Sequence, residues 1–176
     1  MEIEKLVLSG KEGDISSFMK LIEKKQETIY RIARAYTPNS YDAEDCISES
    51  VILAFDRLGQ LKNAGKFYVW FISILVNVCR KRYRSAARTE QFIPEIHGRV
   101  DEEMMGTAEN SLLVENILKH LKENEREILV LRYLQDFSLE ETAEILGVPQ
   151  GTVKSRLNRI ISKIKLRYRR LFSNEI

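Results

Sequence analysis

The chain has 176 residues, of which 44% are hydrophobic and 31% are charged, and it carries a formal net charge of +2. This composition suffices for hydrophobic cores, but no apolar stretch is long enough to span a bilayer and the N-terminus lacks a signal-peptide pattern. Three prolines and eight glycines argue against a turn-rich β-sandwich. Two cysteines make no disulfide framework, which favours a reducing cytoplasm.

The small net charge conceals three blocks. Residues 1–90 hold 15 Lys and Arg against 12 Asp and Glu, and residues 111–176 hold 12 against 9. Between them, residues 91–110 hold one Arg against five acidic residues. Two basic blocks joined by an acidic strip fit binding to nucleic acid or to an acidic protein surface.

Helical periodicity dominates the first basic block. Asp14 is a good N-cap for a first predicted helix, which runs to Tyr36 and is stopped by residues 38–40. A second helix is predicted from about Asp42 to Leu58, a loop over 59–66, and a third helix over 67–84. The apolar stripe of the third helix, which predicts a packed core, consists of Tyr68, Ile72, Leu75, Cys79 and Tyr83.

The helical pattern stops at residue 89 and restarts at Ser111. The intervening residues hold Pro94, Gly98, Gly106 and scattered acids, which predicts a flexible linker over 89–110. The sequence therefore predicts an all-α protein with two small helical domains, 1–88 and 111–176. In the second domain, leucines and isoleucines over 112–121 mark one helix, and Asn124 with Glu127 resembles a capping box for the next.

The strongest functional signal lies between Ser138 and Arg159. Ser138 and Glu141 form a capping box for a short helix, Gly147 suits the turn after it, and Pro149 stands where the next helix begins. This is the layout of a helix-turn-helix, in which small Ala143 and inward-facing Val153 allow the two helices to cross closely. The outward face of the second helix carries polar and basic side chains suited to base edges and phosphates. An ordinary helical hairpin with a solvated face is the alternative.

Two further clusters support more than one interpretation. Cations at Arg80, Lys81, Arg82, Arg84 and Arg88 follow an aromatic-rich segment, which fits phosphate and unpaired-base contacts or a solvated helix end over a core. The carboxylates between Asp42 and Glu49 could hold a divalent ion, but favouring a helix N-terminus is the better explanation.

Catalysis finds little support in the sequence. There is no glycine-rich phosphate loop or nucleophile elbow. Cys46 and Cys79 have no sequence-local partners for zinc, and His97 and His120 lie apart from them. We expect no enzyme activity, no metal and no cofactor.

Together these segments resemble the extracytoplasmic-function (group IV) sigma factors of bacterial RNA polymerase over nearly the whole chain. The run DAEDCISE at 42–49 is similar to the family's D-A-E-D-apolar-x-Q-E motif, and Phe67, Trp70, Phe71, Ile74 and Asn77 match a segment of its domain 2. Residues 139–157 are similar to the helix-turn-helix of its domain 4. Ser48 and Lys122 depart from the family pattern, which commonly has Gln and Pro there.

The resemblance implies a promoter-specificity subunit that binds core polymerase, recognises −35 and −10 elements, helps melt the DNA and serves a stress or envelope-response regulon. It implies docking on the polymerase clamp helices by Asp42, Glu44, Asp45 and Glu49. It implies −10 contacts, including a flipped base held by the loop, from Leu61, Lys62, Asn63, Ala64, Trp70, Asn77, Arg80, Lys81 and Arg84. With domain 4 on the flap tip, it implies −35 contacts from Gln150, Gly151, Thr152, Lys154, Ser155, Arg156, Asn158 and Arg159.

The resemblance also implies a cytoplasmic protein without direct membrane insertion, held inactive by an anti-sigma factor that is often membrane-bound. A plain DNA-binding regulator would explain residues 139–159 but not the segments around Asp42 and Trp70. An all-helical adaptor would not need the basic face between Lys154 and Arg159. Copurification with core polymerase discriminates between these classes.

Overall fold

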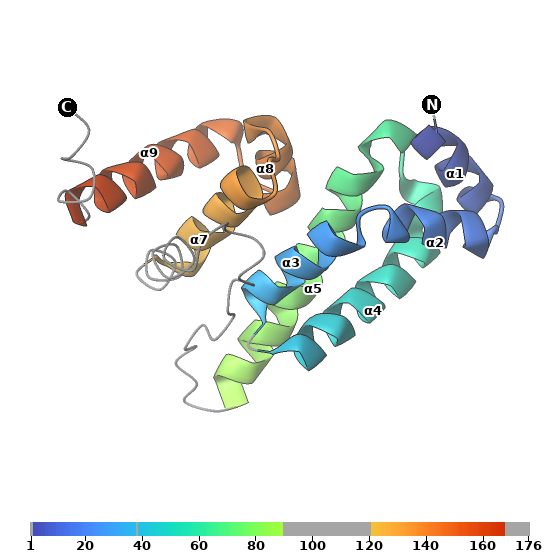
Figure 1. Ribbon diagram of the computed structural model, residues 1–176, viewed down its shortest axis with the longest axis horizontal. Helices are drawn as coiled ribbons and strands as arrows, with labels where there is room; N and C mark the ends of the chain where they lie inside the picture. The colour runs from blue at the N-terminus through green and yellow to red at the C-terminus, as the bar shows by residue number, and fades with distance from the viewer. Residues whose placement is uncertain (1, 38, 90–120, 168–176) are drawn as a thin grey trace. The chain divides into compact units, whose positions relative to one another are not determined.

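The computed structural model describes residues 2–37, 39–89 and 121–167, and within them the fold is all α, as predicted (Figure 1). The chain divides into two compact units, Met1–Gly98 and Arg99–Ile176. This division falls inside the predicted linker, but residues 90–110 lie outside the described residues, so the domain boundaries and the linker's flexibility stay predictions. No helix of the described part is long and apolar enough to cross a membrane.

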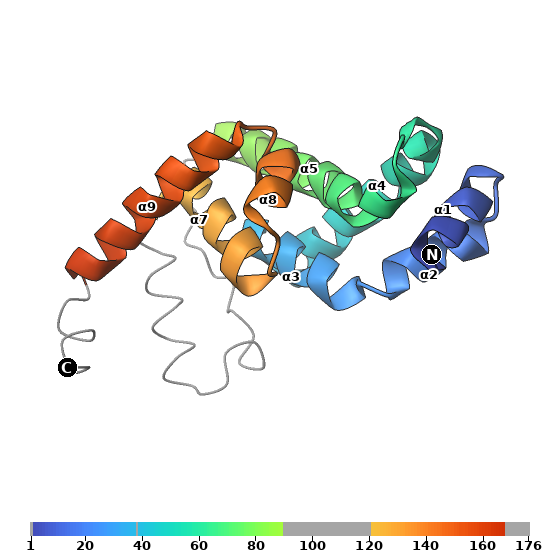
Figure 2. The same ribbon diagram turned by 90° about the horizontal axis from the view of Figure 1, so that it is seen from above.

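The first unit contains five α-helices in its described residues, and two short 3₁₀ turns join the last pair. The elements are α1 (Glu2–Lys11), α2 (Ile15–Glu23), α3 (Gln26–Tyr36), α4 (Ser40–Arg57), η1 (Leu58–Gln60), η2 (Ala64–Lys66) and α5 (Phe67–Thr89). α3, α4 and α5 pack against one another, while α1 and α2 form a hairpin beside the α4–α5 connection (Figures 1 and 2).

An aromatic cluster forms the centre of this core. Phe67 and Phe71 are fully buried, and the ring of Phe67 lies 6.1 Å from that of Phe18 in α2. The predicted core positions Ile72, Leu75 and Cys79 are buried, as expected from the apolar stripe. The side chain of Tyr83 lies outside the described residues.

The N-terminal helices differ from the prediction in two ways. The sequence analysis placed no helix before Asp14, yet α1 occupies Glu2–Lys11, and the predicted helix over 14–36 is broken at Lys24–Lys25. The physical reason for the break is a tertiary contact. The Tyr68 hydroxyl donates a hydrogen bond of 3.1 Å to the Leu21 carbonyl, and the Lys25 ammonium lies 6.0 Å from the Tyr68 ring centroid. Asp14 caps α2 as predicted, accepting from the backbone N–H groups of Ser16 and Ser17.

The second unit packs α7, α8 and α9 around a smaller core. Its described elements are α7 (Glu123–Leu129), which continues as a π-helical turn η4 (Val130–Leu134), then α8 (Leu139–Leu146) and α9 (Gln150–Arg167). Ile128, Leu131, Ile145, Val153 and Ile160 form the buried centre. The helix predicted over 112–121 lies outside the described residues except for its end at Leu121.

The predicted capping box of Asn124 with Glu127 is wrong. α7 begins one residue before Asn124, and its N-cap is Lys122, whose backbone N–H donates to the Glu125 carboxylate over 3.1 Å. The reason is again tertiary, since Lys163 of α9 forms an ion pair with Glu125 and holds that side chain at the start of α7.

Candidate nucleic-acid and protein interfaces

The helix-turn-helix in the second unit follows the local sequence closely. The Ser138 hydroxyl accepts from the Glu141 N–H over 3.1 Å, and the Glu141 carboxylate accepts from the Ser138 N–H over 2.7 Å, which completes the predicted capping box. Gly147 ends α8 with a φ of +66°, a left-handed conformation that glycine adopts without strain. Fully buried Val153 then fixes α9 against α8.

The outward face of α9 holds the residues predicted to read a −35 element. Gln150, Gly151, Lys154, Ser155, Asn158 and Arg159 are exposed, while Thr152 and Arg156 are half-buried. The Ser155 hydroxyl donates to the Thr152 carbonyl over 3.0 Å, which leaves its lone pairs free to accept. The helix therefore presents a polar surface with three cations near its N-terminal half, a suitable shape for a DNA groove.

Further along α9, Lys163 is bound within its own unit instead. Its ammonium pairs with Glu125, whose side chain is only 7% exposed. Burial raises the pKa of Glu125, but the hydrogen bonds from Lys163 and from the Lys122 backbone outweigh it, so the pKa lies below its ordinary value. This pair ties α9 to α7, which holds the outward face of α9 in a defined orientation within the unit.

In the first unit, the acidic residues of α4 that were predicted to bind the polymerase differ in their exposure to solvent. Glu44, Asp45 and Glu49 are exposed. Asp42 is half-buried, and its carboxylate accepts from the Asn39 side-chain amide over 2.9 Å while Asn39 caps α4. Asp42 therefore serves the start of the helix, and the outward acidic surface consists of Glu44, Asp45 and Glu49.

Asp45 has a partner from another helix. The Arg82 guanidinium of α5 donates to its carboxylate over 2.7 Å, and the two side chains remain 43% and 62% exposed. Asp45 therefore lies on the outward acidic surface but already forms an ion pair with Arg82 of the same unit.

Two exposed apolar residues on the same face of α4 were missed by the sequence analysis. Tyr41 is 80% exposed and Ile52 is 63% exposed. Their spacing of four and seven residues from Asp45 places them on one stripe with it. The sequence signal for their exposure is that neither residue belongs to the apolar stripe of α4 that faces the core.

The residues predicted for the −10 region lie on one side of α5. Trp70, Asn77, Lys81 and Arg84 follow one another at spacings of seven, four and three, and Arg80 adjoins them. Trp70 and Arg80 are half-buried, Asn77 and Lys81 are exposed, and the Arg84 side chain lies outside the described residues. The Trp70 ring is supported by Phe67, with centroids 6.1 Å apart.

The loop before α5 is anchored by one buried side chain and exposes most of its other residues. Lys62 and Asn63 are exposed and Ala64 is half-buried, but the Leu61 side chain is only 6% exposed and anchors the loop in the core. The Asn63 side-chain oxygen accepts from the Gly65 N–H over 2.9 Å and so folds η2. A ligand of this loop would meet peptide groups together with the exposed side chains of Lys62, Asn63 and Lys66.

The described part of the chain holds no assembled metal site. No group of three or more His, Cys, Asp or Glu side chains in it could hold a metal ion. Cys46 of α4 and Cys79 of α5 are free thiols and are buried in their unit. A hydrogen bond to Cys46, together with burial, raises the pKa of Cys79, so that thiol stays protonated as a core group.

Comparison with protein families gives two matches in chain order. Residues 21–89 match the Sigma-70 region 2 family, and residues 117–166 match the Sigma-70 region 4 family. Each match falls within one of the two units, and together they cover more than half of the chain.

Individual relatives align over most of their length. The ECF RNA polymerase sigma factor SigW of Bacillus subtilis is 27% identical over 173 residues, covering 90% of this chain and 92% of SigW. The RNA polymerase sigma-E factor of Streptomyces avermitilis is 29% identical, with coverage of 87% and 86%. Among solved structures, CnrH in complex with the cytosolic domain of CnrY has a TM-score of 0.71 at 21% identity, with full coverage of both chains. Sigma factor RpoE in complex with the anti-sigma factor NepR from Bartonella quintana has a TM-score of 0.67 at 22% identity, with coverage of 86% and 96%.

Proposed function

Because this chain belongs to the sigma-70 family, as an extracytoplasmic-function sigma factor, we propose that its two units divide the recognition of core polymerase and promoter between them. The observation that carries this proposal is that regions 2 and 4 match separate units, each with a surface of the right chemistry. The acidic surface of α4 suits a basic partner, while α5 and α9 present cations to DNA.

The second unit would read the −35 element. Residues Gln150–Arg159 of α9 would enter the major groove, with Lys154, Arg156 and Arg159 contacting phosphates or base edges. The capping box and the Gly147 turn hold this helix at a fixed angle to α8. A second contact of this unit with the polymerase flap tip completes the proposal.

The first unit would bind the polymerase clamp and the −10 element. Glu44, Asp45 and Glu49 would dock on the clamp helices, with Tyr41 and Ile52 as apolar anchors beside them. The Trp70–Arg84 side of α5 and the loop over 61–66 would hold the non-template strand, one base of it flipped into the loop. DNA opening would then be driven by binding of unpaired bases, without covalent chemistry by this chain.

Regulation and location extend the proposal. RpoE is solved with an anti-sigma factor, and we propose that such a partner holds this chain inactive until a stress or envelope signal releases it. We propose the cytoplasm as its place of action, since that is where core polymerase and the genome are found.

Run-off transcription tests the function directly. Core polymerase is incubated with a pool of genomic promoter fragments, with and without this protein. Transcripts that need the protein are expected, and their start sites give the −35 and −10 elements. Failure to bind core polymerase, with no new transcripts, would favour a plain DNA-binding regulator.

The −35 role has its own test on a promoter found in this way. Lys154→Ala and Arg156→Ala are each expected to weaken holoenzyme binding by about 1–3 kcal/mol, because each removes a contact to DNA. Lys165→Ala, on the exposed far end of α9, is the matched control and is expected to bind like the wild type. Unchanged occupancy in both test variants would contradict the role given to this face.

A further inference from the structure

We propose that α1 positions the loop over 61–66 for base recognition and that Lys11 is the positioning residue. The inference rests on the proposed role of this loop at the −10 element. It assigns a function to a helix that the region 2 match, which begins at residue 21, does not include.

The first contact lies where the loop begins. The Lys11 ammonium, at the C-terminal end of α1, donates a hydrogen bond of 2.6 Å to the Leu61 carbonyl, fifty residues away in the chain. A charged donor makes a shorter and stronger bond to a carbonyl than a neutral one. Since the Leu61 side chain is buried, the residue is held on both sides at the point where the chain leaves η1.

The second contact lies where the loop ends. Glu4 is seven residues before Lys11 and therefore on the same face of α1. A Cβ built on Gly65 would lie 3.7 Å from the Glu4 carboxylate, so this side chain adjoins η2. Between Glu4 and Lys11, Val7 is fully buried and presses the same face of α1 into the unit.

Close packing fixes the distance between α1 and η1. A Cβ on Gly10 would come within 2.9 Å of the Leu58 side chain, which shows how closely that side chain packs on the backbone of α1. The loop's own shape is already set by the Asn63 cap and by the Lys66 N–H bond to the Asn63 carbonyl, 3.0 Å long. What α1 adds is therefore the position of a preformed loop, and recognition by such a loop is sensitive to shifts of about 0.5 Å.

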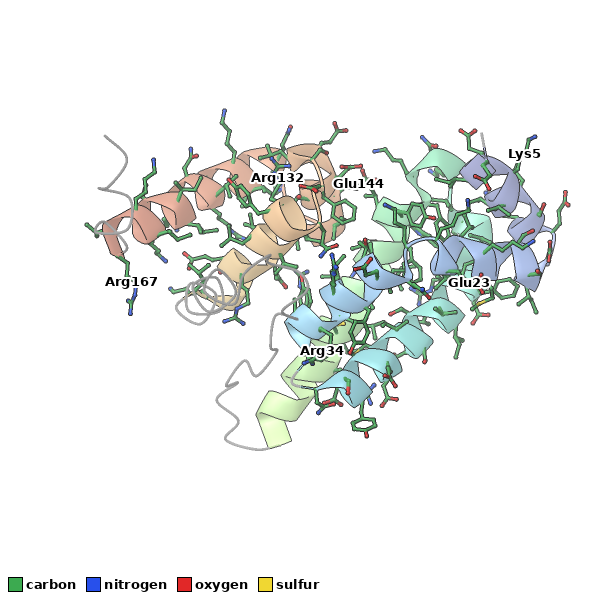
Figure 3. All side chains as sticks on the ribbon, in the orientation of Figure 1. Lys5, Glu23, Arg34, Arg132, Glu144 and Arg167 are labelled. Atoms are coloured by element: carbon green, nitrogen blue, oxygen red, sulfur yellow. The ribbon has the colours of Figure 1, made fainter. Side chains whose placement is uncertain are left out.

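The experiment compares base discrimination in reconstituted holoenzyme. The probe is a labelled single-stranded oligonucleotide that spans the −10 element mapped by run-off transcription, together with versions that carry a single altered base. Lys11→Met removes the donor and keeps the length, and Lys11→Arg keeps a charged donor. Lys5→Met is the matched control, because Lys5 projects from an exposed position of α1 (Figure 3). Lys11→Gln is a second neutral variant, and thermal unfolding confirms that each variant folds.

Lys11→Met and Lys11→Gln are expected to lose about five- to tenfold in discrimination between matched and altered bases, since a hydrogen bond from a charged donor is lost. Lys11→Arg and Lys5→Met are expected to discriminate like the wild type, and core affinity is expected to stay unchanged in all four. Wild-type discrimination in both neutral variants would overturn the positioning role. So would an equal weakening of probe binding for matched and altered bases that Lys11→Arg does not rescue. If the wild-type holoenzyme transcribes but does not discriminate between bases in this probe, the proposed role of the loop itself would be contradicted.

Discussion

The two units build their candidate DNA surfaces in different ways. In the second unit the decisive contacts are local, such as the Ser138–Glu141 capping box and the Gly147 turn. In the first unit, the loop and the acidic surface are joined to other helices by the Lys11–Leu61 and Arg82–Asp45 bonds, which link residues 50 and 37 positions apart. A local surface needs only its own helix pair, whereas a surface made of long-range contacts needs the whole unit to fold.

The largest expected effect comes from the centre of the first core. Phe67 is fully buried and packs against the rings of Phe18 and Phe71, so Phe67→Ala is expected to cost about 3–5 kcal/mol. Peptide-resolved hydrogen exchange should increase across α2–α5, and binding to core polymerase should be lost. Exchange in α8 and α9 should stay unchanged.

Ile15→Ala is the control, since Ile15 of α2 is 61% exposed, contributes little to the hydrophobic core and lies outside the proposed binding surfaces. Equal loss of protection in both units after Phe67→Ala would contradict their independence and would mean that they share one cooperative core.

A second, smaller effect tests the Lys163–Glu125 ion pair, which joins α9 to α7. Lys163→Met leaves the Glu125 carboxylate buried without its cation, which is expected to cost about 1–3 kcal/mol because Lys163 itself is 45% exposed. The loss is read from denaturant unfolding of the second unit at neutral pH.

The pH dependence of this variant has a definite sign. In the wild type the depressed pKa of Glu125 adds stability above the ordinary value of 4.5, and this stability is lost as the pH falls through the folded-state pKa. Without Lys163, burial is opposed only by the Lys122 contributions, so the pKa of Glu125 should lie higher than in the wild type and the variant should lose less stability as the carboxyl is protonated. The difference between variant and wild type should shrink from pH 7 to pH 4, and a difference independent of pH would refute the pairing.

The same contrast explains what could be predicted from the sequence. The turn at Gly147, the cap at Asp14 and the buried stripe of α5 were predictable because each depends on neighbours within one or two helical turns. Both predicted units are found, and their all-α character follows from the periodicity of the apolar residues.

Several of the misses involve partners that the local sequence does not reveal. The break between α2 and α3 depends on Tyr68, and the true cap of α7 depends on Lys163. The burial of Leu61 and the pairing of Asp45 likewise require the fold of the first unit. The local sequence pattern could therefore identify the acidic and basic surfaces. It could not show which of their side chains are buried or already bonded to another helix.

A third prediction concerns a purely local contact. Ser138→Ala removes the N-cap of α8 and is expected to destabilise the second unit by about 1 kcal/mol without changing the first. Ser162→Ala is the matched control, because that hydroxyl only donates to a carbonyl within α9. Peptide-resolved hydrogen exchange measures both, and a similar loss in the control would show that the cap contributes nothing specific.

The smallest effect concerns the Arg82–Asp45 pair, which joins α5 to the acidic surface of α4. Both side chains of the Arg82–Asp45 pair are largely solvated, so Arg82→Ala should change stability by less than about 1 kcal/mol. If Arg82 competes with a basic surface of the polymerase for Asp45, its removal should raise core affinity by about two- to threefold. Asp45→Lys should lower core affinity, since it reverses a charge on the proposed docking surface.

Lys81→Ala is the matched control, because it removes the adjacent exposed cation of α5, which is proposed to face DNA, and should leave affinity for core polymerase unchanged. The measurement is a titration of core polymerase with each labelled variant at two salt concentrations, since an exposed charge effect weakens as salt rises. Weaker core binding by Arg82→Ala would mean that Arg82 orients Asp45 toward the polymerase. The Arg82–Asp45 bond would then help to form the polymerase-docking surface, as the Lys11–Leu61 bond is proposed to help position the loop.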